Sequence, residues 1–582
     1  MKTSLQIASE ARLDHIGAVA ERLGIPERFV ETHGRYKAKI ELDILDEYRQ
    51  RPTGKYILVT AITPTPLGEG KTTTTIGLGM ALSKLGKNAA IAIRQSSLGP
   101  VFGIKGGGAG GGYAQVVPLE ASVLHLNGDF HAVAQAHNQI AALTDNSWYH
   151  GNPLDIDPER IQIRRVLDVN DRFLRNVTIG QGGHADGIPR AAGFDIVAAS
   201  ELMAILALVS GQNNVEALKS LRARLGRVVV AFDQRGRPVT AEDIGAAGAA
   251  TVLMRETLKP NLMQTIENTP AFIHAGPFGN IAHGNSSILA DQIALRAADY
   301  VVTEAGFGAD MGGEKFFDIK CRYSNLWPVA AVMVATVRAL KSHTGKYKIT
   351  PGKPLPPELL VENPDDVYTG GANLRKQIAN VRRFGVPVVV ALNAFPEDRP
   401  SEVEAVRQIA LESGAADMAV STVFAEGGQG GLELARKVVA AAVGATHASP
   451  LPATRASPEP QFLYPLDLPI KDKIRAIATE IYGAAGVSFS EQAEAQIATF
   501  EANGFGELPI CMAKTHLSLS HDPGLKGAPS GYTFPIREVR ASVGAGFIYP
   551  LAGSMMTMPG LGANSAALHI DIDEQGNTVG LF

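Results

Sequence analysis

The sequence predicts an α/β protein with a parallel sheet core that helices cover on both faces. Short β-branched runs bounded by turn residues predict the buried strands, and helical patterns follow them. Ligands bind where the carboxyl ends of parallel strands meet, so we expect functional residues in the loops after these runs. The runs are YILVTAI (56–62), AAIAI (89–93), RVVVAFD (227–233), AFIHAG (271–276), DYVVTEAG (299–306), VPVVVALNAF (386–395) and DMAVST (417–422).

The length of 582 residues exceeds what one hydrophobic core usually organises, which predicts at least two domains. Residues 446–460 (THASPLPATRASPEP) are rich in Pro, Ser and Ala without periodicity, and we interpret them as a linker. Residues 1–445 are expected to bind the ligands, as one unit or as two subdomains. Residues 461–582 have helical and then strand-like stretches, including ELPICMAKT (507–515), and predict a smaller C-terminal α+β domain.

The composition indicates a protein that handles small molecules. Lys and Arg number 54 against 58 Asp and Glu, a net charge of -4, which argues against capture of nucleic acid or acidic lipid. Only two cysteines occur, which favours a reducing compartment. No segment has the apolar length of a signal peptide or a membrane span, so the sequence predicts a cytoplasmic protein.

The segment TPLGEGKTTTT (65–75) follows the first strong strand and precedes a helical pattern. It resembles the loop GxxxxGK[ST], in which backbone N–H groups and Lys hold phosphate and a hydroxyl holds Mg²⁺, although Thr65 stands at the first glycine position. We expect a P-loop NTPase-like core that binds ATP; GTP would fit equally, and an ordinary βα turn is the alternative. The expected nucleotide-binding residues are Thr65, Pro66, Leu67, Gly68, Glu69, Gly70, Lys71, Thr72 and Thr73, with Thr72 and Thr73 also serving Mg²⁺.

A glycine-rich segment follows the next strand along the chain. Arg94 ends this strand, Lys105 follows, and six glycines occur within 106–112. Glycine at this density is most useful where the chain approaches a ligand or another backbone closely, and a flexible loop is the alternative. We expect the two cations to hold oxygens of a transferred group.

Three histidines, His125, His131 and His137, could suggest a metal site. His131 and His137 are six residues apart, so on a helix they point about 240 degrees apart and cannot share one ion. We therefore expect structural histidines or substrate contacts.

Aromatic residues follow two of the later strands. Phe395 and Pro396 end one strand, and Phe424 follows the next. Two rings at the ligand edge of the sheet could hold a flat heterocycle by offset stacking, whereas packing in the core is the commoner role of such residues.

Together these segments resemble the formate–tetrahydrofolate ligase family over nearly the whole chain. The blocks that carry the resemblance, in order, are TPLGEGKTTTT, SLGPVFGIKGGGAGGGYAQVVP, NGDFHAV, RRVLDVNDRFLR, GPFGNIAHG, DYVVTEAGFGAD, EKFFDIKCR, VATVRALKSHTG, FGVPVVVALNAFP and MTMPGLG. The family also has Thr at the position of Thr65, so the unusual loop is similar to the family's own variant.

The resemblance implies ATP-dependent ligation of formate to tetrahydrofolate through formyl phosphate. It implies catalytic roles for Lys71 and Arg94, with Arg94 holding formyl phosphate, and a pterin contact for Phe395 and Pro396. Phe424 stands where the family commonly has Trp and is expected to contact the folate. The family is typically a homotetramer.

The sequence departs from the family pattern at four places. Gln95 replaces a Glu that the family associates with monovalent-cation activation, so K⁺ dependence is left in question. Phe424 replaces the stacking Trp, Ser554 an acidic residue, and Thr344 a glycine. These changes keep two alternatives open: a ligase-like paralogue with altered substrate or reduced activity, and a nucleotide-switch regulatory protein.

Overall fold

A computed structural model describes residues 2–103, 108–349, 354–444, 460–553 and 555–581. Its largest sheet has 12 strands, and every neighbouring pair from β15 to β19 is parallel. This confirms the α/β class. In spatial order the strands are β1 (Val30–Thr32), β2 (Ala38–Ile40), β14 (Asn261–Thr265), β15 (Pro270–Ile273), β4 (Ala89–Ile93), β16 (Tyr300–Glu304), β3 (Lys55–Ala61), β17 (Ala330–Ala335), β18 (Val388–Asn393) and β19 (Asp417–Ser421), with β5 (Gly110–Gly111) and β6 (Ala114–Val117) beside β14.

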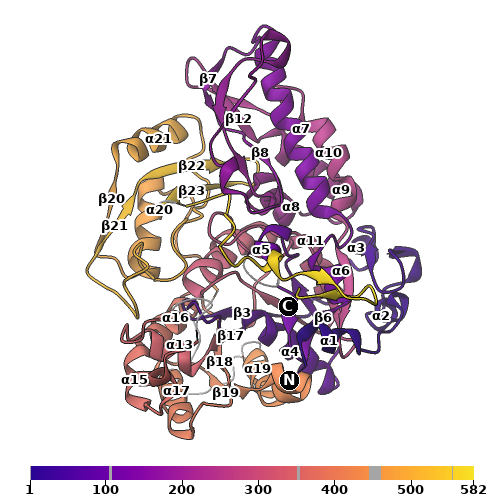
Figure 1. The fold of residues 1–582 in the computed structure, drawn as a ribbon, viewed down its shortest axis with the longest axis vertical. Helices are drawn as coiled ribbons and strands as arrows, with labels where there is room; N and C mark the ends of the chain where they lie inside the picture. Colours follow the sequence, from indigo (N-terminus) through magenta and orange to yellow (C-terminus); the bar gives the residue numbers. More distant parts are fainter. Residues whose placement is uncertain (1, 104–107, 350–353, 445–459, 554, 582) are drawn as a thin grey trace.

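Helices cover both faces of the parallel part of the sheet, which lies in the lower half of Figure 1. Side chains alternate along a strand, so β3 contributes to two cores. Ile57 and Val59 pack in the cluster that includes α4 (Lys71–Lys84) and α19 (Leu432–Gly444), and Leu58 belongs to the large cluster on the other face. The helices of that second face include α11 (Ile288–Ala297), α13 (Val337–Ser342), α15 (Pro364–Gly370), α16 (Ala372–Arg383) and α17 (Pro400–Glu412).

The strand prediction was wrong in one place and incomplete in another. The run 227–233 forms β12 (Val229–Asp233), which pairs antiparallel with β13 (Pro238–Thr240) and β7 (Ile156–Ile161) in a separate sheet. A tight turn joins β12 directly to β13, and a hairpin leaves no room for the crossover that parallel pairing requires. The central strand β17, by contrast, was not among the predicted strands.

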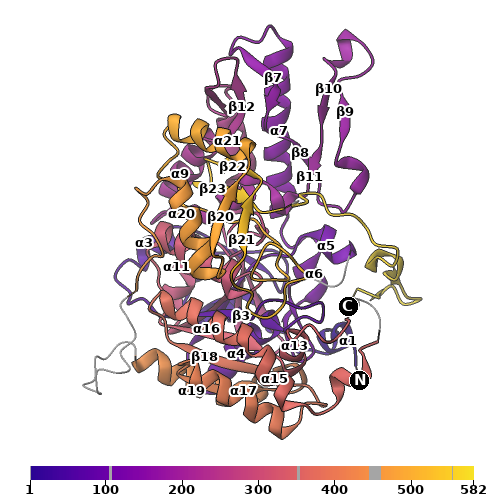
Figure 2. The same ribbon diagram turned by 90° about the vertical axis from the view of Figure 1, so that its left-hand side faces the viewer.

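The segment between β6 and β14 forms the upper part of the molecule in Figures 1 and 2. Its long helix α7 packs against α10, and the hairpin β9–β10 stands beside it in Figure 2. The elements are α7 (Asp129–Tyr149), β8 (Arg165–Val166), β9 (Val177–Ile179), β10 (Arg190–Ala192), β11 (Phe194–Asp195), α8 (Glu201–Leu208), α9 (Asn214–Gly226) and α10 (Ala247–Met254).

The C-terminal region contains helices and short strands. The stretch 507–515 forms only isolated bridges, Ile510 to Ile548 and Ala513 to Leu551, rather than the expected strand. The expected linker 446–460 lies almost entirely outside the described residues. The elements are α20 (Ile470–Ala476), β20 (Gly486–Phe489), α21 (Glu491–Ala502), β21 (Thr533–Ile536), β22 (Glu538–Ser542), β23 (Phe547–Leu551), β24 (Asp571–Ile572) and β25 (Thr578–Val579).

Shorter helices connect these parts. They are α1 (Ser4–Ser9), α2 (Ile16–Arg22), α3 (Ile44–Glu47), α5 (Leu98–Gly103), α6 (Leu119–Val123), α12 (Arg322–Ser324), α14 (Pro357–Leu360) and α18 (Val423–Glu426).

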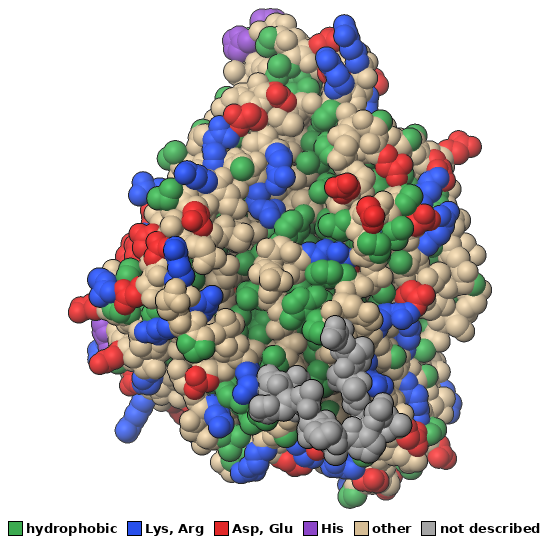
Figure 3. Space-filling model, turned by 180° about the vertical axis from the view of Figure 1, so that it is seen from behind, with side chains coloured by type: hydrophobic (Ala, Val, Ile, Leu, Met, Phe, Trp, Pro, Cys, Tyr) green, Lys and Arg blue, Asp and Glu red, His purple; other side chains and the backbone are tan. Residues whose placement is uncertain are grey.

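The surface seen from behind carries basic and acidic side chains interspersed, without a single basic face (Figure 3). Among the described residues, no helix combines the length and apolar character needed to cross a bilayer. Cys321 and Cys511 are both free and buried.

Candidate functional site

The candidate residues lie at the carboxyl edge of the parallel strands. The loop 62–70 follows β3, Arg94 follows β4, and Glu304 ends β16. Phe395 follows β18, and Phe424 lies in α18 directly after β19. Parallel pairing brings these chain-distant loops to one edge of the sheet.

Thr65 fits the loop because its backbone needs no glycine there. Its φ is not positive, whereas Gly68 and Gly70 have φ values of 75° and 74°. The Glu69 carboxylate accepts hydrogen bonds from the Thr65 N–H, at 2.8 Å, and from the Thr65 hydroxyl, at 2.9 Å. The side chain at position 65 therefore braces the loop, a function that glycine could not supply.

Gly70 is required by close packing as well as by its backbone conformation. A Cβ built on Gly70 would lie 2.3 Å from Nδ2 of Asn393, which donates a hydrogen bond to the Glu69 carbonyl. Strand β18 thus presses on the loop immediately before helix α4 begins at Lys71.

A buried carboxylate, Glu304, binds the residues predicted to handle phosphate. Its Oε2 accepts hydrogen bonds from the Lys71 ammonium at 2.7 Å and from the Thr72 hydroxyl at 2.8 Å. The sequence reasoning missed Glu304, although it ends a predicted strand in the block DYVVTEAGFGAD. Its position as a charged residue ending an apolar strand was the available signal.

The electrostatics of this cluster are coupled. Burial raises the pKa of Glu304, but the charges of Lys71 and Arg94 outweigh it and lower the pKa overall. Burial lowers the pKa of Lys71, and the Glu304 charge opposes this. The two cations, Lys71 and Arg94, face two buried acids, Glu304 and Glu69. An incoming anion would replace an acid as the partner of a cation.

Arg94 is held by the loop after β15. One of its terminal nitrogens donates to the Pro277 carbonyl at 2.8 Å, and its Nε is buried without a hydrogen-bond partner. Burial lowers the pKa of its guanidinium. A buried donor without a partner is costly, so Arg94 retains capacity to bind an anionic group.

Phe395 and Phe424 follow adjacent strands but contact different neighbours. The Arg338 guanidinium carbon lies 3.3 Å from the centre of the Phe395 ring. Phe424 is 46% exposed, and a Cβ added to Gly112 would lie 2.2 Å from its carbonyl oxygen. No contact between the two rings exists in the described part of the chain. Pro396 is exposed beside Phe395.

The other loop residues have local roles. Gly112 confirms that the glycine-rich segment allows close approach of another backbone. Pro66 is exposed, and Leu67 and Thr73 are half-buried. Thr73 makes no side-chain hydrogen bond within the described ranges, so only Thr72 of the two predicted metal ligands contacts an acid.

The three histidines differ in their surroundings. His137 is buried and hydrogen-bonded to the Ser200 hydroxyl and the Arg164 carbonyl, and His125 and His131 are exposed. In the described segments, no group of three or more His, Cys, Asp or Glu side chains could hold a metal ion. The expectation of structural histidines is confirmed for His137.

The family departures have mixed outcomes. Thr344 donates to the Lys341 carbonyl at 2.7 Å and closes the end of α13, so it fits the backbone. Gln95 is buried, and its Oε1 has no partner. Ser554 and Lys105 lie outside the described residues.

The fold and this edge define the class: an α/β protein with a cation-rich glycine loop at the end of its central strand. The sequence profile described as formate–tetrahydrofolate ligase matches residues 2–582. The chain belongs to this family and is a ligase.

Relatives of known name agree. The formate–tetrahydrofolate ligase of Chloroflexus aurantiacus (strain J-10-fl) is 69% identical over 583 residues, covering 100% of both chains. Those of Herpetosiphon aurantiacus and Saccharopolyspora erythraea are 68% and 58% identical, covering 100% of this chain and 100% and 99% of theirs. The resemblance inferred from the sequence blocks is confirmed.

Proposed function

We propose that this chain joins formate to tetrahydrofolate at the edge formed by the β3 loop, using ATP. Family membership over residues 2–582 supports the reaction. The observation that carries the location is the convergence of Lys71, Thr72 and Arg94 around Glu304. A core of the P-loop NTPase type is part of this proposal.

The reaction has two steps. A formate oxygen attacks the outer phosphorus of ATP, the bond from that phosphorus to the bridging oxygen breaks, and ADP leaves with formyl phosphate formed. The 10-nitrogen of tetrahydrofolate then attacks the formyl carbon, loses its proton, and expels phosphate. Phosphate leaves readily where hydroxide would not, which is why activation is required.

The loop stabilises charge in the first step. Lys71 and the N–H groups at the start of α4 would hold the outer phosphate oxygens, where a positive helix end favours an anion. Lys71 would exchange its Glu304 partner for phosphate. The loop residues from Thr65 to Gly70 would position these groups rather than react.

The donor set around Thr72 fits a divalent cation. A hydroxyl and a carboxylate, 2.8 Å apart at Thr72 and Glu304, are oxygen ligands of the kind Mg²⁺ prefers. We propose that both hold Mg²⁺, directly or through water, and that the ion neutralises phosphate charge when bound. Thr73 is a weaker candidate because it contacts no acid.

Arg94 would bind formyl phosphate. Its guanidinium is fixed by the Pro277 carbonyl and keeps a buried donor unused. Fixed donors that match a developing charge are effective in group transfer.

The folate would bind near Phe395, Pro396 and Phe424. Arg338 occupies one face of the Phe395 ring, so a pterin would stack on the other. The exposed ring of Phe424 offers a second surface. We separately propose that the buried Gln95 side-chain oxygen binds K⁺. The support is that this oxygen has no hydrogen-bond partner among the described residues.

Assembly and layout complete the proposal. We propose a homotetramer in the cytoplasm, with a ligand-binding region 1–445 and a C-terminal domain 461–582. Membership of the ligase family along the whole chain leaves the nucleotide-switch alternative without support.

The test measures ADP release from MgATP with formate and tetrahydrofolate, supplied separately and together. We expect sustained release only with both. Turnover that ignores both substrates would exclude the proposal, and a requirement for folate with another acid would favour the altered paralogue.

A further inference from the structure

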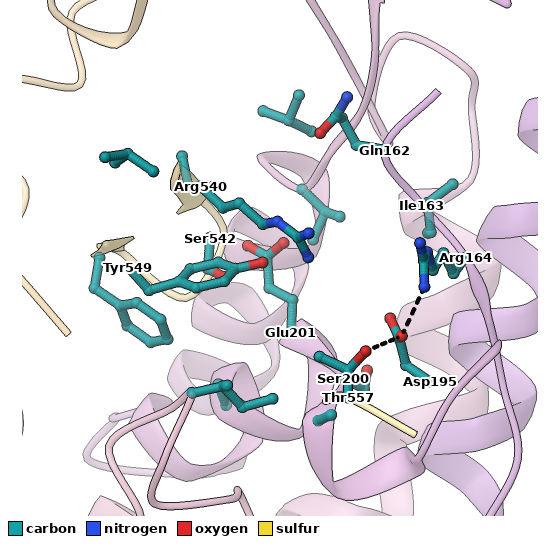
Figure 4. A pocket seen from close by; sticks show the side chains of 18 of the residues that line it. Gln162, Ile163, Arg164, Asp195, Ser200, Glu201, Arg540, Ser542, Tyr549 and Thr557 are labelled. Carbon is teal, nitrogen blue, oxygen red and sulfur yellow. Dashed lines mark hydrogen bonds and ion pairs between the residues drawn. The ribbon is translucent and has the colours of Figure 1, made fainter. Parts of the chain in front are cut away.

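A second site lies between the upper segment and the C-terminal region (Figure 4). The cavity has a volume of about 410 Å³, which is within the range of small-molecule sites. Strands β7 and β12 and helix α8 form one wall, and β22, β23 and α21 form the other. None of the residues of the β3 loop, nor Arg94, lines it.

The cavity nevertheless touches the loop that holds Arg94. Ile281 and Ala282 line it, and they belong to the same loop as Pro277, whose carbonyl binds Arg94. The two sites therefore share one backbone segment.

Each of the arginines that line the cavity already contacts another side chain of the protein. Arg540 donates to Glu538 at 2.6 Å, and Arg164 lies 3.7 Å from Asp195. Arg160 stacks over the Phe232 ring, 4.7 Å from its centre. An anionic ligand would have to compete with Glu538 for Arg540 and with Asp195 for Arg164, while Arg160 contacts an aromatic ring.

Glu201 is a cavity-lining acid without an ion-pair partner among the described residues. Its Oε1 accepts hydrogen bonds from the backbone N–H groups of Gly544, at 2.7 Å, and Ala545, at 3.1 Å. Across the part of the chain that the structure describes, Glu201 forms no ion pair and its second oxygen has no partner. Figure 4 shows its carboxyl group within the cavity, near Tyr549 and Arg540.

The walls favour a flat ligand. Aromatic rings line the cavity from both sides, and Ser542 and Tyr549 place hydroxyl groups on it. A carboxyl group pairs with the amino edge of a nitrogen heterocycle, and rings stack on its faces. The rings are Phe232, Phe500, Phe505, Phe547 and Tyr549.

We propose that this cavity binds an amino-substituted nitrogen heterocycle, with Glu201 accepting from or donating to its polar edge. Two sources share this chemistry: the pterin of a folate and the adenine of a nucleotide.

The two sources differ in their response to pH. Burial raises the pKa of Glu201 to about 7. The ionised oxygen accepts from the donor edge of a pterin, so pterin affinity falls below pH 7; the protonated oxygen donates to a ring nitrogen of adenine, so adenosine affinity falls above it. The charged or titratable groups that line the cavity or act on Glu201 are His137, Arg160, Arg164, Asp195, Arg227, Glu538, Arg540 and Tyr549.

Calorimetric titration of the full chain with free pterin and with adenosine tests the proposal. We expect one of them to bind with one equivalent that Glu201→Leu weakens at least tenfold, because leucine, unlike an amide, can neither donate to nor accept from the heterocycle. The matched control Glu574→Leu, at an exposed acid for which the described part of the chain shows no ion pair, should leave binding unchanged. Ala204→Phe, which fills the cavity without changing charge, should abolish the same equivalent.

Equal affinity in Glu201→Leu and the unaltered chain, or no binding of either probe, would overturn the proposal. The variant Phe395→Ala distinguishes binding at the reaction site from binding in the cavity. It should leave the Glu201-dependent equivalent intact. The unfolding temperature of each variant checks that it is folded.

Discussion

Two buried acids, Glu304 and Glu201, occupy opposite electrostatic situations in this molecule. Glu304 accepts from Lys71 and lies near Arg94, and these cations lower its pKa. Glu201 accepts hydrogen bonds from two backbone N–H groups, and burial raises its pKa to about 7. Two cations beside Glu304 prepare the first site for an anion, whereas an acid without an ion-pair partner prepares the second site for a hydrogen-bonding ligand.

The largest expected effect on activity comes from removing the Lys71 ammonium beside Glu304. Lys71→Ala should reduce ADP formation by about 10³-fold or more, since a fixed donor to transition-state charge is lost. The measurement is the initial rate with both substrates. Lys84→Ala, at the other end of the same helix and paired with Glu267 at 3.3 Å, is the matched control. Full activity in Lys71→Ala would remove this residue from the mechanism.

A smaller effect, on the Mg²⁺ requirement, is expected when the Glu304 carboxylate is replaced by an amide. Glu304→Gln should raise the Mg²⁺ concentration needed for half-maximal ADP release by roughly 10- to 100-fold, as for groups that orient a metal. The measurement is a Mg²⁺ titration of the rate. An unchanged Mg²⁺ dependence would contradict the role of Glu304 as a metal-holding acid.

Glu201 should instead make the free energy of unfolding depend on pH. The pKa of Glu201 in the folded chain, about 7, lies above its usual value, so the folded state holds the proton more tightly. Glu201 therefore contributes to the free energy of unfolding at a pH below the ordinary pKa of Glu. This contribution, about 3 kcal/mol at most, is lost as the pH rises through 7. Denaturant unfolding from pH 4.5 to 8 should show this fall, and Glu201→Gln should lack it. Parallel profiles for the two chains would refute the assignment.

The smallest effect is expected at the sheet edge. Phe424→Trp adds ring area to an exposed surface and should tighten tetrahydrofolate by roughly 0.5–1.5 kcal/mol, a few-fold in affinity. The measurement is the KM for tetrahydrofolate. Phe173→Trp, at a ring that is 85% exposed, is the control. Weaker affinity in Phe424→Trp would argue against stacking at this position.

Much of the first region could be read from local sequence. A strand, a glycine loop, Lys71 and a helix follow one another within a short stretch, and local order fixes their geometry. Glu304 was missed because it is more than 200 residues away, and only parallel pairing of β16 with β3 brings it to Lys71. The strand 227–233 was misassigned because its residue types suit a buried strand of either direction, and the hairpin to β13 decided the pairing.

The sequence by itself determined the α/β class, the family and the order of strand, glycine loop and helix around Lys71, since these depend on periodicity and on residues close together in the chain. Only the tertiary structure decided which side chains meet: Glu304 contacts Lys71, Arg338 lies over the Phe395 ring, and Glu201 forms no ion pair within the described residues. The physical reason is that electrostatic energy depends on distance in space and on burial, and both are set by how strands and segments pack together.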